Sequence, residues 1–357
     1  MTGIPPIVDA TAAVMHGPDP RLRAEAIEGP GGRERHDALA ARIGALGTVE
    51  VRPPPSQPEA TPPARFRVAA WNIERCKHVG PTAALLARTG ADLLLLSEMD
   101  HGMARSGNRH TTAEVAAALG HGHAFATEFV ELGLGDDRER GWHAGGINVE
   151  GLHGNAIASR HPLRAAARVA LDDGGRWFAE GAPHEQRRIG GRCAVVAIVD
   201  TAAGPLAAAS LHLESHSDPA DRLAQVSRLL AALDRLAPGL PAVVGGDFNT
   251  AALPAGVDPA DRDSAWFTAP GTLEPLFDAF AGAGFAWREA NTPEPTCRTL
   301  PDGHPLPPFR RIDWVFVRGV SAAAPRTWAA VDDHGSAISD HELLTVDVTM
   351  DGGTGAA

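Results

Sequence analysis

Short apolar runs recur along the chain from residue 65 onward and alternate with stretches of helical periodicity. Apolar runs of this length, bounded by glycine, proline and polar residues, predict buried strands. We expect strands at residues 66–71, 91–97, 155–159, 193–199, 205–213, 242–246, 312–317 and 344–348, and helices at 82–88, 112–119 and 219–236. The alternation is typical of a layered α/β domain.

Residues 1–64 have a different pattern. A helix is expected around residues 33–46, and VRPPPSQPEATPP at 51–63 favours a linker, because proline cannot continue a helix or a central strand. We therefore predict an N-terminal arm with a proline-rich linker over 1–64 and one large domain over 65–357. The segments 131–154, 172–191 and 250–310 are rich in Gly, Pro, His and Trp, and we expect long loops there that contact substrate.

Several apolar runs lead into residues that can bind a metal ion or move a proton. These are RVAAWNIE (Asn72, Glu74), LLLLSE (Glu98), ASLHLES (His212), VVGGDFN (Asp247, Asn249), RIDWVF (Asp313) and SAISDHE (Asp340, His341). A single acid after a strand is more often a helix cap, and a single histidine is more often a surface or core group. Their recurrence at strand ends, where α/β folds build active sites, argues against coincidence.

In chain order, WNIE, SE, GNAIASRHP, HLES, GDFN, IDWVF and SDH resemble the motif series of the endonuclease/exonuclease/phosphatase (deoxyribonuclease-like) superfamily. The resemblance extends from about Arg65 to Val348. It implies a four-layer α/β/β/α sandwich, with two facing mixed sheets and helices outside, and makes residues 65–357 the catalytic domain. It does not identify the substrate, because members cleave DNA, RNA tails, inositol phosphates, sphingomyelin and other phosphoesters.

The resemblance also implies a metal site. Carboxylates without cysteine ligands suit a hard cation such as Mg²⁺ or Mn²⁺. Glu98 corresponds to the main ligand of the superfamily, and Glu74 and Asp340 are expected to assist it, directly or through water. Many members have an aspartate in place of Glu74.

The catalytic roles are assigned by the same resemblance. Asp247, with Asn249 beside it, is expected to orient and deprotonate the attacking water, and Asp313 to hold His341 toward the phosphate. The chain has no tyrosine, so His212 resembles the histidine of the two-histidine members and is expected to face the scissile phosphate with His341.

Further polar residues are candidates for substrate binding. Asn72 and Asn155 are expected to bind phosphate oxygens or hold the acids, although Asn155 could equally belong to a structural turn. Arg105, Arg109 and Arg188 could clamp a second anion or be ordinary surface arginines. The histidines of the first half of the domain lack zinc-site spacing, which disfavours a second metal, although His121-x-His123 is suggestive of one.

The net charge of −12 favours a small or lipid-derived phosphoester over nucleic acid, whose binders usually carry a basic patch. The two-histidine arrangement favours the alternative, a Mg²⁺-dependent nuclease. A catalytically inactive binding protein on the same fold is disfavoured, because every expected acid, amide and histidine is present. Three cysteines, no signal peptide and no transmembrane run predict a cytoplasmic protein, and no segment indicates a protein partner.

Overall fold

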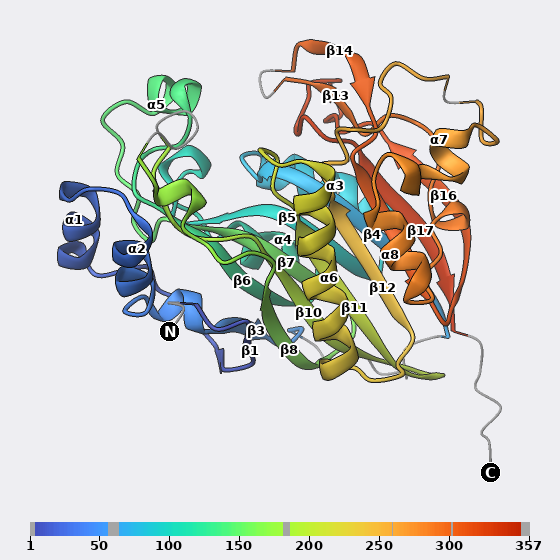
Figure 1. Ribbon diagram of the computed structural model, residues 1–357, viewed down its shortest axis with the longest axis horizontal. Coiled ribbons are helices and arrows are strands. Elements are labelled where there is room, and N and C mark those ends of the chain that lie inside the picture. Colours follow the sequence, from blue (N-terminus) through green and yellow to red (C-terminus); the bar gives the residue numbers. More distant parts are fainter. Residues whose placement is uncertain (1–3, 56–63, 181–185, 259, 301–302, 351–357) are drawn as a thin grey trace.

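The computed structural model describes residues 4–55, 64–180, 186–258, 260–300 and 303–350. Two β-sheets face each other and helices cover their outer faces (Figure 1). Sheet A contains, in spatial order, β1 (Ile7–Val8), β8 (Leu163–Ala170), β10 (Cys193–Thr201), β11 (Gly204–His212), β12 (Ala242–Asp247) and β15 (Asp313–Arg318).

Sheet B contains the other strands of the sandwich. Its spatial order is β16 (Ser321–Trp328), β17 (Leu343–Thr349), β4 (Arg65–Arg75), β5 (Leu93–His101), β7 (Leu152–Ser159), β6 (Gly122–Glu131), β3 (Val49–Arg52) and β2 (Thr11–Ala12), and β9 (Arg188–Gly190) pairs with β6. Helices α3 (Val79–Thr89) and α4 (Thr111–Leu119) pack on its outer face, and α6 (Pro219–Leu236) and α8 (Leu276–Gly282) pack on the outer face of sheet A.

Alternating side chains explain the layers. In β5, Leu93 and Leu95 enter the core between the sheets, whereas Leu94 and Leu96 enter the core under α3 and α4. Successive residues of a strand point to opposite faces, so a strand covered on both sides reads as a continuous apolar run. The four-layer sandwich predicted from the sequence is confirmed, and each predicted strand and each of the three predicted main helices is present.

The described part of the arm joins the sandwich. Helix α1 (Pro20–Glu28) and α2 (Arg33–Ala40) precede a 3₁₀ turn at Gly44–Gly47, where one helix was expected over 33–46. Strand β1 pairs with β8, and β3 pairs with β6, so the arm extends both sheets. Val51 and Arg52 belong to β3, so the predicted linker begins later than expected. Residues 56–63 of this linker lie outside the described residues.

Two predicted loops contain regular structure. Segment 131–154 includes α5 (Asp137–Trp142), and 250–310 includes α7 (Ala265–Thr268), α8, β13 (Cys297–Thr299) and β14 (Pro305–Arg310). Phe277 and Phe280 of α8 are fully buried in the core of sheet A, so this part of 250–310 is structural. Within the described residues, no helix is long and apolar enough to cross a membrane.

Candidate active site

The strand register of sheet A brings three predicted catalytic residues into one row. His212 at the end of β11 pairs with Asp247 at the end of β12, and Asp247 pairs with Asp313 at the start of β15. Strands β11 and β12 are parallel and β15 is antiparallel to them, so the two C-terminal ends and one N-terminal end meet at the same sheet edge. Three residues far apart in sequence thereby become neighbours.

Sheet B supplies the opposite wall through two irregular strand ends. Its register shifts between Asn72 and Arg75 in β4 and between Leu96 and Met99 in β5. Left-handed backbone occurs here at Glu74 (φ 45°), Arg75 (φ 66°) and Glu98 (φ 60°). Such conformations cost about 1–3 kcal/mol each for non-glycine residues and are typical of functional sites. Glu98, at the shift in β5, has its side chain in the pocket lining.

Asn72 links the two walls. Its Nδ2 lies 3.1 Å from Asp247 Oδ2 of sheet A and 3.3 Å from Glu98 Oε1 of sheet B. His212 lies between the same two carboxylates, with Nε2 3.4 Å from Asp247 Oδ2 and Nδ1 3.8 Å from Glu98 Oε1. The backbone N–H of Asn249 donates to Asp247 Oδ1 at 2.8 Å, which fixes the orientation of that carboxylate.

His341 is held as a cation. Its Nδ1 lies 2.8 Å from Asp313 Oδ2, its Nε2 lies 3.8 Å from Asp247 Oδ2, and its carbonyl accepts a hydrogen bond from Trp71 Nε1. Burial alone lowers the pKa of His341, but Asp313, Asp247 and Asp340 outweigh burial and raise this pKa well above its usual value. The ring is therefore an imidazolium that points its second N–H into the site.

Asp247 and His212 are shifted toward their neutral forms. Burial and the nearby Asp313 raise the pKa of Asp247 to about 7, against the opposing effect of His341. Burial, followed by Arg192 and other cations, lowers the pKa of His212 well below its usual value. The site thus combines a carboxyl group that titrates near neutrality, an imidazolium and a neutral imidazole, which is a set suited to general acid–base chemistry.

The predicted ligands suit a hard divalent cation. Burial and the Asp340 carboxylate raise the pKa of Glu74 to about 7, so a cation between these acids would relieve their repulsion. In the described structure, Lys77 lies against Glu74 and Arg75 against Glu98 Oε2, which shows that both acids attract positive charge. Glu98 Oε1 remains beside Asn72 and His212. His341 Nδ1 is paired with Asp313, and the ligand atoms of Asp247, Asp313 and His341 are also close enough together to hold a metal ion.

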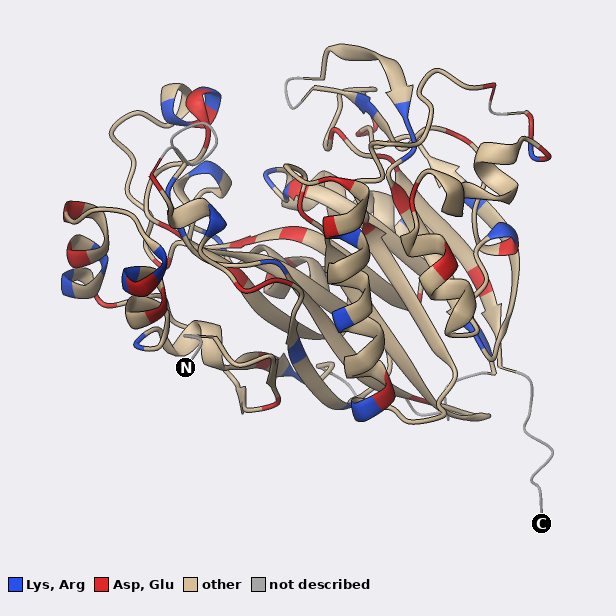
Figure 2. Cartoon of the chain, viewed as in Figure 1, with Lys and Arg blue, Asp and Glu red and all other residues tan. Residues whose placement is uncertain are grey.

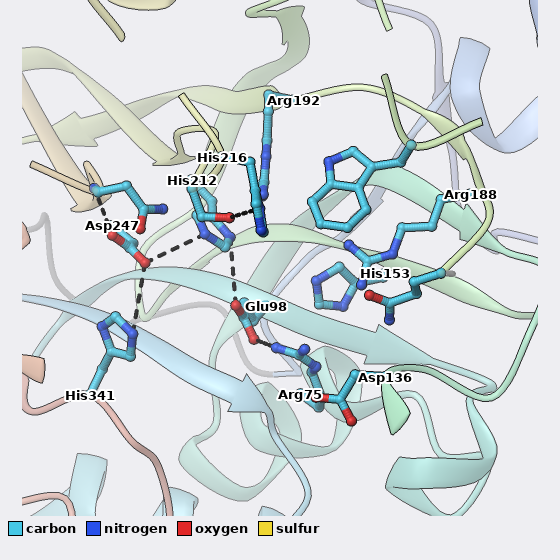
Figure 3. Close-up of a pocket in the computed structure, with 14 residues that line it drawn as sticks. Arg75, Glu98, Asp136, His153, Arg188, Arg192, His212, His216, Asp247 and His341 are labelled. Atoms are coloured by element: carbon cyan, nitrogen blue, oxygen red, sulfur yellow. Dashed lines mark hydrogen bonds and ion pairs between the residues drawn. The ribbon is translucent and has the colours of Figure 1, made fainter. Parts of the chain in front are cut away.

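Five of the predicted site residues, Glu98, His212, Asp247, Asn249 and His341, line one pocket of about 220 Å³ (Figure 3), whereas Asn72, Glu74, Asp313 and Asp340 are not part of its lining. Asp247 and His341 lie on one side, and His153 and Arg188 lie on the other, with Glu98 and Arg75 between them. The full lining is Arg75, Glu98, Asp136, His153, Trp177, Gln186, Arg188, Arg192, His212, Ser215, His216, Asp247, Asn249 and His341. Segments 131–154 and 172–191 contribute to it as predicted, whereas no described residue of 250–310 does.

The predicted substrate-binding residues have different positions. Arg188 lines the pocket, whereas Arg109 is half exposed and paired with Glu114 outside it. Asn155 is buried in β7 and donates from Nδ2 to the Cys193 carbonyl at 2.8 Å, so it ties sheet B to sheet A and does not line the pocket.

The prediction for Arg105 is corrected by the structure. Its side chain is fully buried and pairs with Asp100 at 2.8 Å, Glu139 at 3.1 Å and Glu131 at 3.5 Å. All of its charge is therefore compensated inside the fold, and it is absent from the pocket lining. Arg105 supports Glu139, which in turn accepts from Arg75 Nε at 3.1 Å.

Several pocket residues were not predicted as site residues. Arg75 follows the WNIE motif directly, so its position offered a signal. Arg192 directly precedes the strand predicted at 193–199, a position that by itself does not distinguish a site residue from an ordinary surface arginine. Trp177, Gln186 and His216 come from loops, where sequence pattern alone gives no direction for a side chain.

A second cluster of ligand-type residues lies away from the pocket. Glu50 Oε1 is 2.9 Å from His110 Nε2, 3.1 Å from His123 Nε2 and 2.9 Å from Arg52 Nε. His110 Nδ1 accepts the Ala113 N–H, so its neutral ring carries the proton on Nε2 and donates to Glu50. The cluster thus anchors β3 through hydrogen bonds, and its three ligand-type side chains, Glu50, His110 and His123, are also close enough together to hold a metal ion.

Fold and site together define a phosphoester hydrolase of the four-layer sandwich class. The sequence matches the model of the Endonuclease/Exonuclease/phosphatase family over residues 69–341, and the chain belongs to this family. Family members hydrolyse phosphoester bonds, generally with divalent metal ions. No curated protein gave a significant match.

Solved structures share the fold at low sequence identity. An endonuclease/exonuclease/phosphatase from Beutenbergia cavernae is 21% identical with a TM-score of 0.56, covering 82% of this chain and 73% of that one. The human Nocturnin catalytic domain with bound sulfate is 17% identical with a TM-score of 0.52 (80% and 94% covered). A family member from Bacteroides vulgatus is 16% identical with a TM-score of 0.51 (80% and 99% covered).

Proposed function

We propose that this chain hydrolyses a small phosphoester in a reaction that requires Mg²⁺ or Mn²⁺. The observation that carries the proposal is the convergence of Asp247, Glu98 and His341 in one pocket, with Asp313 paired to His341 behind it. A carboxyl group with a pKa of about 7 can accept a proton from water at neutral pH, and an adjacent imidazolium can stabilise negative charge on phosphate oxygens.

The residues of the chain divide the work as follows. Asp247 orients a water molecule and takes its proton as the water oxygen attacks phosphorus. The P–O bond to the leaving group breaks, and His341 donates its Nε2 proton toward the oxygen that gains charge. Asp313 keeps His341 in the correct orientation, and neutral His212 hydrogen-bonds another phosphate oxygen. The products are an alcohol and a phosphate with one fewer ester bond.

Glu98, assisted by Glu74 and Asp340, would hold the divalent cation. When bound, such a cation neutralises phosphate charge and polarises the P–O bond. The oxygen donor set and the mutual repulsion of Glu74 and Asp340 support this assignment.

The shape and charge of the site favour a small substrate over nucleic acid. Asp136 of the 131–154 segment and Trp177 of the 172–191 segment bound the pocket on the side away from His341. Figure 2 shows acidic and basic residues interspersed along the described chain, and the net charge is −12. The nuclease alternative is supported by the presence of both His212 and His341, and it predicts cleavage of duplex or single-stranded DNA.

The test is hydrolysis of bis(4-nitrophenyl) phosphate by protein that has been dialysed against a chelator and then supplied with Mg²⁺ or Mn²⁺. We expect metal-dependent release of 4-nitrophenol that is lost in His341→Gln and kept in Asp200→Asn, an exposed aspartate paired with Arg164. Nicking of supercoiled plasmid at low salt is measured in parallel, because low salt strengthens weak DNA binding. Metal-independent turnover would refute the mechanism, and efficient nicking would favour the nuclease.

A further inference from the structure

The side of the pocket opposite His341 contains hydrogen-bond donors that the proposed hydrolysis does not use. Gln186 is only 5% exposed, lines the pocket, and has no partner for its Nε2 among the described residues. A buried amide donor without an acceptor costs about 1–3 kcal/mol, so its retention suggests an absent acceptor. A bound ligand that offers an oxygen to Gln186 would meet this need.

Arg188 lies beside Gln186 and is incompletely neutralised. Its one carboxylate neighbour in the described chain is Glu131, with Nε 2.9 Å from Oε1, and Arg105 shares that same oxygen. Within the described residues, neither Nη atom of Arg188 donates a hydrogen bond. Arg192, in contrast, pairs with both Glu128 and Glu214. The guanidinium therefore retains donors for a ligand.

The local charge balance points the same way. Burial and three neighbouring arginines lower the pKa of Arg188, against the single opposing effect of Glu131. His153, on the same side of the pocket, has a pKa well below its usual value because of burial and the same group of arginines. Figure 3 shows Arg188 and His153 together on this side of the pocket, and an anion there could pair with the Nη atoms of Arg188, which have no carboxylate partner among the described residues.

Aromatic contacts hold this side rigid. The Arg188 guanidinium lies 4.6 Å from the centre of the Trp177 ring and 5.2 Å from that of Phe129. Trp177 Nε1 donates to Glu214 at 2.8 Å, which fixes the indole. A guanidinium fixed in this way loses little further conformational freedom when it binds a ligand, so the site is preorganised for a planar or tetrahedral anion.

We propose that Gln186 and Arg188 bind a second anionic group of the substrate, so that the enzyme selects small phosphoesters carrying a phosphate or carboxylate besides the scissile phosphate. This inference rests on the proposed function, because it assumes that the scissile phosphate lies beside Asp247 and His341. It assigns the substrate class and makes Gln186 and Arg188 specificity-determining residues.

The experiment measures competitive inhibition of bis(4-nitrophenyl) phosphate hydrolysis at saturating Mg²⁺. The inhibitors are propylphosphonate, with one anionic group, and the 1,3-propane-, 1,4-butane- and 1,5-pentanediphosphonates, with two; 3-phosphonopropanoate tests a carboxylate. We expect at least one two-anion compound to inhibit with an inhibition constant about 10- to 100-fold lower than propylphosphonate, as charge-assisted hydrogen bonds in a buried site allow. The diphosphonate and carboxylate arms distinguish the two kinds of second anion.

Two variants test the residues. Gln186→Ala removes a donor that has no partner in the fold, so it should fold normally and reduce the gain from the second anion to below about threefold. Arg188→Gln should do the same, and Arg164→Gln, an exposed arginine paired with Asp200, should keep the full gain. In each variant the gain is calculated from that variant's own inhibition constant for propylphosphonate, and this constant should stay within about twofold of the wild type in Arg164→Gln.

Each outcome separates the two proposals. Absence of metal-dependent hydrolysis in the wild type would refute the proposed function itself. Hydrolysis with equal inhibition by one-anion and two-anion compounds of every length would refute the second-anion site alone. A gain that survives in both folded Gln186→Ala and folded Arg188→Gln, verified by unchanged melting temperature, would also overturn the assignment of these residues.

Discussion

Replacing Asp247 with asparagine should inactivate the protein and at the same time stabilise it. The variant keeps the size and one oxygen of the side chain but cannot take a proton from water. Loss of a general base typically reduces turnover by about 10²- to 10⁴-fold. The Asn72 contact at 3.1 Å and the Asn249 N–H contact at 2.8 Å both end on oxygens of this side chain, and an amide oxygen can still accept one of them.

The gain in stability follows from the pKa of Asp247. Burial and Asp313 raise this pKa from 3.8 to about 7. As pH rises from 3.8 to 7, the unfolded chain releases the proton while the folded chain retains it, so the free energy of unfolding falls and the loss is complete above 7. At about 1.4 kcal/mol for each pH unit, the full loss approaches about 4 kcal/mol in metal-free protein. Asparagine does not ionise and avoids this loss.

The assay is urea denaturation in the presence of a chelator at pH 5 and pH 8, with turnover of bis(4-nitrophenyl) phosphate measured separately with Mg²⁺. We expect Asp247→Asn to exceed the wild type in unfolding free energy by about 2–4 kcal/mol at pH 8 and by clearly less at pH 5. Asp200→Asn, on an exposed pair with Arg164, should change neither quantity. An inactive variant that is less stable than wild type at both pH values would refute the reasoning, because Asp247 would then be a structural residue.

Three other changes have defined outcomes. Asp313→Asn should lower kcat by about 10²- to 10⁴-fold with little change in KM, because His341 loses the carboxylate that orients and charges it; steady-state kinetics decide, and wild-type kcat would contradict the pairing. Arg105→Met should lower the free energy of unfolding by about 3–5 kcal/mol in urea, since it leaves buried Asp100 without its arginine and removes one of the two arginines paired with Glu131 and with Glu139; a loss below about 1 kcal/mol would contradict this. Burial raises the pKa of Glu50, but His110, His123 and Arg52 outweigh burial and hold this pKa well below 4.5. Glu50 therefore stabilises the fold above pH 4.5, and this contribution is lost as the pH falls. Glu50→Gln should lower the free energy of unfolding at pH 7 and make it depend less on pH in the acid range, which urea denaturation at several pH values measures.

The strands that carry the site could be predicted because they are apolar on both faces and end in polar motifs. The runs before Glu98 and Asp247 belong to strands covered on both sides, and this is the pattern that sequence reading detects most easily. The motif order then gave the family, which the family match confirmed. The roles assigned to individual site residues remain predictions that the experiments above address.

The side of the pocket opposite His341 could not be predicted for physical reasons. Strand β6 contains buried Glu128 and Glu131, whose burial is stable only because Arg192 and Arg188 pair with them from another segment. A pattern that assigns charged residues to the surface therefore misses both the strand and its partners. Arg105 illustrates the same limit in reverse, since it was a candidate for binding a second anion and its side chain lies inside the fold.

The bridge that Asn72 forms between Asp247 and Glu98 joins groups that belong to separate sheets. The distance between the carboxylates of Asp247 and Glu98, the proposed water-activating and metal-binding groups, therefore depends on how closely the two sheets pack against each other. Side chains buried between the sheets, such as Leu95 and Ala208, would in this way affect catalysis through the spacing of the two sheets, without contacting the substrate. Adaptation of this enzyme to a different temperature would have to preserve that spacing. We therefore expect a larger side chain at one position between the sheets to be accompanied by a smaller one at the position facing it.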